Sequence, residues 1–230
     1  EALARLWPAL AGSLLAVAPF LFRRELGRPL ALTFTTLLSI SPLMVAASRT
    51  ADSTTLAWLS LLGVLAAALH YRKQGNANAL RLMALLIGLG LATGPAFIAG
   101  LLIIGLTAIL TVRFAEVEPS SYPFIAGLRS QAREILALAL VALLLGSTLL
   151  LVYAPGLNAV GQGWLNWALG WAAWQGRSPL DAFVLITLYE PLLLIMLLPG
   201  LGLAFYNRQP AMLALTIAAG LGALFGLLYL

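Results

Sequence analysis

The chain has no cysteine and only one histidine, His70, among 230 residues. The lack of cysteine excludes disulfides, thiolate metal sites and cysteine nucleophiles. A single histidine excludes any metal or haem site that needs several imidazoles. His70 lies beside Tyr71, Arg72 and Lys73, a setting typical of a membrane interface rather than of a ligand.

Charge is also scarce, since Asp, Glu, Lys and Arg make up 9% of the residues and hydrophobic residues 62%. Soluble domains carry roughly 25% charged residues, so this chain has too few to cover a soluble globule. The abundance of apolar residues equally excludes a disordered chain. The composition predicts an all-α, polytopic transmembrane helical bundle that forms one domain over residues 1–230 and has the lipid bilayer as its surroundings.

Long apolar runs support this interpretation, because they are too long for strands and lack the period-two alternation of a membrane barrel. We expect about eight spans, the fourth and fifth separated only by a tight break at Gly94-Pro95. The predicted spans cover residues 6–22, 30–47, 53–70, 79–94, 96–112, 134–154, 182–206 and 210–230.

The basic residues predict the orientation of these spans. With the amino terminus outside, ten of the thirteen basic residues fall in inner loops, which is the bias seen on the cytoplasmic side of membranes. The net charge of +5 therefore reflects topology and not binding to nucleic acid, and both termini are predicted outside. The inner set is Arg23, Arg24, Arg28, Arg72, Lys73, Arg81, Arg113, Arg129, Arg133 and Arg208, and the outer set is Arg5, Arg49 and Arg177.

The outer connection 155–181 is rich in tryptophan. Trp164, Trp167, Trp171 and Trp174 recur at spacings of three and four, which places them on one face of an amphipathic helix. A helix lying in the headgroup layer with its indoles at the interface explains the pattern. The same face would also suit stacking on sugars.

Two further places carry charge next to or inside a predicted span. Arg49 and Asp52 flank an outer turn at a spacing that allows them to face each other; an outward arginine suits a phosphate, and the aspartate suits a divalent cation such as Mg²⁺ or Mn²⁺. An ordinary interfacial salt bridge is the alternative. Tyr189 and Glu190 precede Pro191, and Glu190 lies roughly 12 Å into its span. They form either the polar wall of a cavity or a helix-to-helix hydrogen bond.

Glycines cluster in the fourth and fifth spans. Gly88, Gly90, Gly94 and Gly100 include a small-xxx-small spacing, which favours close approach of neighbouring helices.

The order of these motifs resembles integral-membrane glycosyltransferases of the GT-C superfamily, which include protein mannosyltransferase and aminoarabinose transferase relatives. The resemblance is carried by RRELGR, a span ending in Ser41-Pro42, then SRTADS and GLATGPAFIAGLL. The segment QGWLNWALGWAAWQGRSPLDAFVLITLYEPLLLI is most similar to the flippase-activity-associated family of Archaea and Chloroflexi.

This resemblance implies a transferase in a prokaryotic plasma membrane that uses a polyprenyl-phosphate-linked sugar on its extracytoplasmic face. Asp52 matches the second acidic position of the superfamily, which handles metal or phosphate, and Arg49 would contact the donor phosphate. The chain begins at Glu1, where the family's second span would begin, so the family's first span and its acidic first loop are not in the sequence. The expected general base is therefore missing from it.

Two other functions fit the same residues. A non-catalytic subunit of a larger membrane complex could use the same scaffold, with the Trp-rich helix as a contact for other membrane subunits. A lipid flippase or transporter would suit the helix breaks at Gly94-Pro95 and Glu190-Pro191, although the sequence shows no repeat.

Overall fold

The computed structural model describes residues 2–23, 27–49, 53–114, 127, 129–148 and 150–172, with scattered positions between 180 and 224 that include residues 216–222. All regular structure in these residues is helical, which confirms the all-α prediction. The elements are α1 (Ala2–Val17), η1 (Ala18–Phe22), α3 (Arg28–Ile40), α4 (Pro42–Arg49), α5 (Thr54–Gln74), α6 (Ala77–Thr93), α7 (Pro95–Phe114), α9 (Ala132–Ser147) and α10 (Pro155–Ala172).

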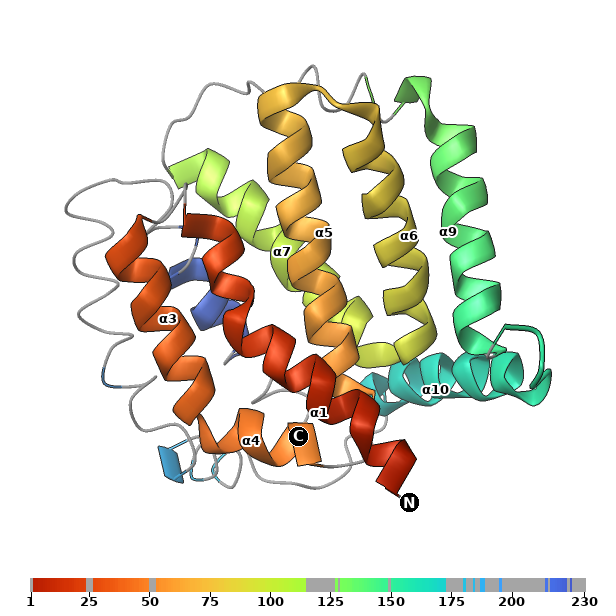
Figure 1. Ribbon diagram of the computed structural model, residues 1–230, viewed down its shortest axis with the longest axis horizontal. Helices are drawn as coiled ribbons and strands as arrows, with labels where there is room; N and C mark the ends of the chain where they lie inside the picture. The colour runs from red at the N-terminus through yellow and green to blue at the C-terminus, as the bar shows by residue number, and fades with distance from the viewer. Residues whose placement is uncertain are drawn as a thin grey trace.

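The longer helices run back and forth between two ends of the molecule, while α4 and α10 lie across one of these ends (Figure 1). Short, well-capped connections produce the reversals. Gly75 ends α5 with a φ of 64° that glycine adopts readily, and its N–H donates to the Tyr71 carbonyl at 2.8 Å. The Asn76 side chain then caps α6 by accepting from the Asn78 N–H at 3.0 Å.

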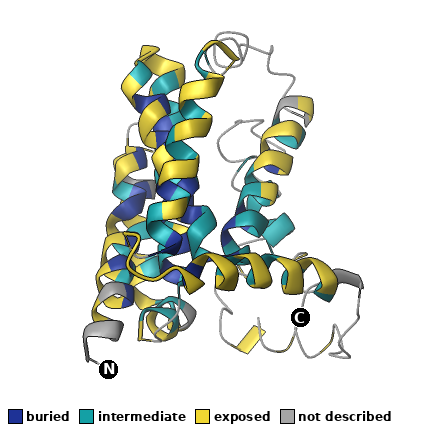
Figure 2. Cartoon of the chain, turned by 90° about the vertical axis from the view of Figure 1, so that its right-hand side faces the viewer, coloured by how far each residue is buried: buried dark blue, intermediate teal, exposed yellow. Residues whose placement is uncertain are grey.

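The core lies between α5, α6 and α7, and most outward faces are exposed (Figure 2). Leu80 and Phe97 are fully buried, and Leu61 and Val64 pack in the same cluster. Phe97 fits against α6 because residue 90 is glycine, and a Cβ added there would overlap the phenylalanine ring. The prediction that the glycines permit close packing is thus confirmed at this contact.

Gly88 makes a second close approach, between α6 and α9. A Cβ at this position would lie 2.7 Å from the Ala142 Cβ and 2.9 Å from the Leu143 backbone nitrogen. The two helices are neighbours along their lengths, as Figure 1 shows. Gly94, with a φ of 109°, separates α6 from α7, as the Gly94-Pro95 pair predicted.

Three predicted spans differ from the observed helices. The first changes from α-helix to 3₁₀-helix at Ala18, because Pro19 has no N–H with which to continue the α-helical bonds. The second is broken at Ser41, whose ψ of 120° is the extended conformation expected before proline, and α4 begins anew at Pro42.

The third difference is at the end of α9, which stops at Ser147 although the prediction continues to residue 154. Thr148 Oγ1 donates to the Leu144 carbonyl at 2.6 Å and accepts from the Leu151 N–H at 3.0 Å. Such local side-chain bonds compete with the helical pattern. Leu150 and Leu151 then turn the chain with φ of 61° and 69°.

Among the described residues, α5 is the one helix both long and apolar enough to cross a membrane. Only 33% of its apolar window is buried inside the protein. Shorter apolar helices cover Pro8–Phe22, Ala31–Ile40, Ala77–Thr93 and Pro95–Thr111. Of the predicted spans 182–206 and 210–230, the structure describes scattered positions in the first and residues 214, 216–222 and 224 in the second, and all of these positions are helical.

Candidate functional site

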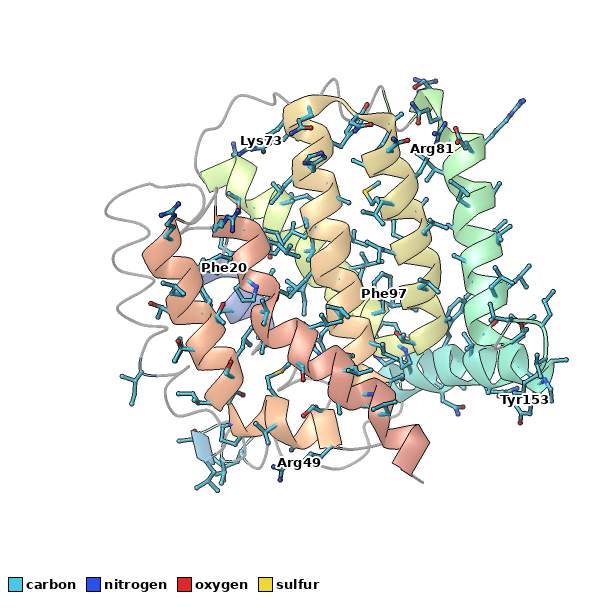
Figure 3. The ribbon with its side chains drawn as sticks, in the orientation of Figure 1. Phe20, Arg49, Lys73, Arg81, Phe97 and Tyr153 are labelled. Carbon is cyan, nitrogen blue, oxygen red and sulfur yellow. The ribbon has the colours of Figure 1, made fainter. Side chains whose placement is uncertain are left out.

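The candidate residues that the structure describes lie at the end of the bundle crossed by α4 and α10. Figure 3 shows Arg49 at this end, together with Tyr153 of the turn before α10, and Lys73 and Arg81 at the opposite end. Which of these two ends faces the outside of a membrane stays a prediction from the basic residues.

Arg49 is the last residue of α4, and its exposed side chain points away from the bundle (Figure 3). The helix that carries it is held against α1, since a Cβ added to Gly12 would lie 2.5 Å from the Ser48 Cβ. Asp52, the predicted partner of Arg49, lies outside the described residues. The proximity of these two side chains therefore stays a prediction.

The residue after Asp52 is fixed by a contact that the sequence did not reveal. Ser53 Oγ donates to the Thr93 carbonyl at 2.6 Å and so ties the start of α5 to the end of α6. A serine before a helix ordinarily suggests a side-chain N-cap, but Ser53 makes no such bond. The two described residues on either side of Asp52 are thus both held in place, Arg49 as the end of α4 and Ser53 by its bond to the end of α6.

A buried polar group lies two residues after Ser53, in the first turn of α5. Thr55 is fully buried, and its Oγ1 has no hydrogen-bond partner. Hydroxyls in such places normally find an acceptor, so Thr55 adds a polar atom without a partner to the first turn of α5.

The Trp-rich segment forms α10, which lies across the end of α9 and also contacts α6 and α7. Trp164 and Trp167 are both partly buried, whereas Leu165 and Leu169 are 52% and 55% exposed. The face that carries the first two tryptophans is therefore the less exposed one and does not point freely outward. Trp164 Nε1 is buried without a hydrogen-bond partner. The Trp171 side chain and all of Trp174 lie outside the described structure.

Tyr189 and Glu190, predicted as a cavity wall, also lie outside the described residues. In the described part of the chain, no group of three or more His, Asp or Glu side chains could hold a metal ion. Asp52 lies outside the described residues, so the divalent cation predicted there stays a prediction. Comparison with family models, with curated proteins and with solved structures yields no match for this chain.

Proposed function

We propose that this chain is the membrane domain of a GT-C-like glycosyltransferase, with the α4 and α10 end on the extracytoplasmic side. The donor is a sugar linked to polyprenyl phosphate. Arg49 binds the donor phosphate through charge-assisted hydrogen bonds, and Asp52 orients that arginine and the phosphate. The general base of the reaction is not assigned to any residue of this sequence.

Helix lengths support a polytopic membrane protein. The helices α1, α5, α6, α7 and α9 contain between 16 and 21 residues. At 1.5 Å per residue they extend for about 24–32 Å, close to the roughly 30 Å of a bilayer's hydrocarbon core. With the two spans predicted beyond residue 181 and the kinked pair α3–α4, these helices make up the proposed eight spans.

Exposed apolar side chains give independent support. Leu14, Ile109 and Leu136 are 59%, 66% and 62% exposed, and each lies on a different helix. Soluble proteins rarely leave extensive apolar surfaces open to water, whereas lipid covers them without cost.

The observation that carries the transferase proposal is the position of Arg49. It lies exposed on a short helix across the end opposite Lys73 and Arg81, three residues before Asp52 and four before the anchored Ser53. An arginine at this place can reach a lipid phosphate in the outer headgroup layer, where a polyprenyl-phosphate donor presents its charge.

The test is sugar transfer from a polyprenyl-phosphate donor by membranes that contain the full-length protein. Arg49→Gln should lower turnover by about 10- to 150-fold, the loss expected for hydrogen bonds to a charged group. Asp52→Asn should lower turnover by a factor in the same range. The matched control is Glu134→Gln, which removes a carboxylate at the opposite end and should leave turnover unchanged.

Unchanged turnover in both Arg49→Gln and Asp52→Asn would contradict the proposal. If the protein then purified together with other membrane proteins, the non-catalytic subunit would become the better interpretation. Counterflow of a labelled lipid-linked sugar in proteoliposomes, without transfer, would instead indicate a flippase.

A further inference from the structure

Charge is unevenly divided between the two ends of the molecule. In the predicted topology the inner side carries ten basic and four acidic residues, a net charge of +6, and the outer side has a net charge of −1. The inner acidic residues are Glu25, Glu116, Glu118 and Glu134, and the outer acidic residues are Glu1, Asp52, Asp181 and Glu190.

The basic side chains on the inner side are exposed wherever the structure describes them. They are Arg23, Arg28, Arg72, Lys73, Arg81, Arg113, Arg129 and Arg133. Of the four inner acidic residues, Glu134 is the one within the described residues. Its Oε1 accepts a hydrogen bond from Arg81 Nε at 2.7 Å. This pair neutralises a single positive charge, so the surface as a whole stays strongly basic.

A hollow with a volume of about 490 Å³ lies within this surface, at the start of α9. Arg129 and Arg133 line it with Ser130, Gln131 and Glu134; Arg129 lies just before α9 and Arg133 in the first turn of this helix. Ser130 Oγ donates to the Gly127 carbonyl at 2.9 Å, whereas Gln131 Oε1 is buried and has no donor. The hollow thus offers two guanidinium groups for an anion, and the Glu134 carboxylate in its lining is paired with Arg81.

The face of α9 below the hollow is apolar and exposed. Leu136, Leu140 and Leu144 follow Arg133 at spacings of three and four and are 62%, 49% and 42% exposed. From Arg133 to Leu144 this stripe extends for roughly 16 Å at 1.5 Å per residue, about the depth of one leaflet's hydrocarbon. A positive head above an apolar stripe of this length is complementary to a phospholipid and not to a free anion.

We propose that Arg129 and Arg133 bind the phosphate headgroup of an anionic phospholipid whose acyl chains lie along Leu136, Leu140 and Leu144. The inference rests on the membrane placement in the proposed function but not on sugar transfer.

The experiment measures lipid binding to the full chain purified in a zwitterionic detergent, by native mass spectrometry. Phosphatidylglycerol should bind more tightly than phosphatidylcholine. Since a basic residue near an anionic lipid surface contributes about fivefold in affinity, Arg129→Gln combined with Arg133→Gln should weaken phosphatidylglycerol binding by about 25-fold. The control pair Arg23→Gln with Arg28→Gln removes equal charge from another part of the same side and should weaken binding by less than about fivefold.

Further measurements distinguish binding of a phospholipid from binding of free phosphate and exclude misfolding of the variants. Inorganic phosphate should compete only weakly, and Leu136→Gln should weaken lipid binding while it leaves phosphate binding unchanged. Circular dichroism should show full helicity in each variant, because the substituted side chains are exposed. Equal binding of the two lipids, an unaffected arginine double variant, or phosphate binding as tight as lipid binding would overturn the proposal. Loss of transfer activity has no bearing on any of these results.

Discussion

Gly88 offers a sharp test of how α6 and α9 pack. A Cβ at this position would meet the Ala142 Cβ at 2.7 Å and the Leu143 nitrogen at 2.9 Å. Carbon atoms in contact prefer separations of roughly 3.5–4.0 Å, so the shortfall from Ala142 is about 1 Å. Neither obstacle can rotate away, because one is backbone and the other is bonded directly to it. In Gly88→Ala the two helices must therefore move apart.

The magnitude follows from two opposing effects. Overpacking costs about 1–3 kcal/mol, and replacing a helical glycine by alanine returns about 1 kcal/mol of helix propensity. Because the obstacles are rigid, the cost of overpacking lies in the upper part of its range. After the gain in helix propensity is subtracted, we expect Gly88→Ala to lower the free energy of unfolding by about 1–2 kcal/mol. For a chain of this size that lowers Tm by roughly 2–8 °C.

The assay is thermal unfolding of the detergent-solubilised protein, followed by circular dichroism. Gly105→Ala in α7 is the matched control, because no atom lies within 4 Å of its added Cβ. It should raise stability by up to about 1 kcal/mol through helix propensity alone. If Gly88→Ala were as stable as Gly105→Ala, the close packing of α6 against α9 would be refuted.

Four other substitutions have expected outcomes in the same assay. Phe97→Ala empties the centre of the core and should cost about 3–5 kcal/mol, and a loss below 1 kcal/mol would contradict its full burial. Ser53→Ala removes the bond to the Thr93 carbonyl and should cost about 0.5–1.5 kcal/mol; no change would mean that this bond does not hold the start of α5. Arg81→Gln should cost at most about 1 kcal/mol, because the Arg81–Glu134 pair is half exposed, and Glu134→Gln should match it. A larger loss in either would show that the pair is structural.

The sequence predicted those turns whose residues have few conformational alternatives. Gly94-Pro95 could be recognised because proline cannot continue a helix and glycine tolerates a positive φ. The end of α9 could not be recognised from the sequence, because Leu149, Leu150 and Leu151 continue an apolar run. What ends the helix is Thr148, whose hydroxyl bonds to Leu144 and Leu151, and threonine also occurs inside helices.

The candidate site was predictable only in part. Spacing alone indicated that the tryptophans share a face of one helix, and Trp164 and Trp167 are indeed similarly buried on α10. Periodicity does not tell which side of a helix meets the protein and which meets lipid, because both surroundings are apolar. The bond between Ser53 and Thr93 joins residues forty positions apart, a distance along the chain over which no local pattern carries information.

The orientation in the membrane is the central claim, and the cysteine-free sequence allows a direct measurement. Single-cysteine variants Gln74→Cys, at the end of α5, and Gln162→Cys, on α10, place a thiol at exposed positions of opposite ends. A membrane-impermeant maleimide added to intact cells should label Gln162→Cys and leave Gln74→Cys unlabelled until the cells are opened. Labelling of Gln74→Cys alone in intact cells, or of both variants, would contradict the account.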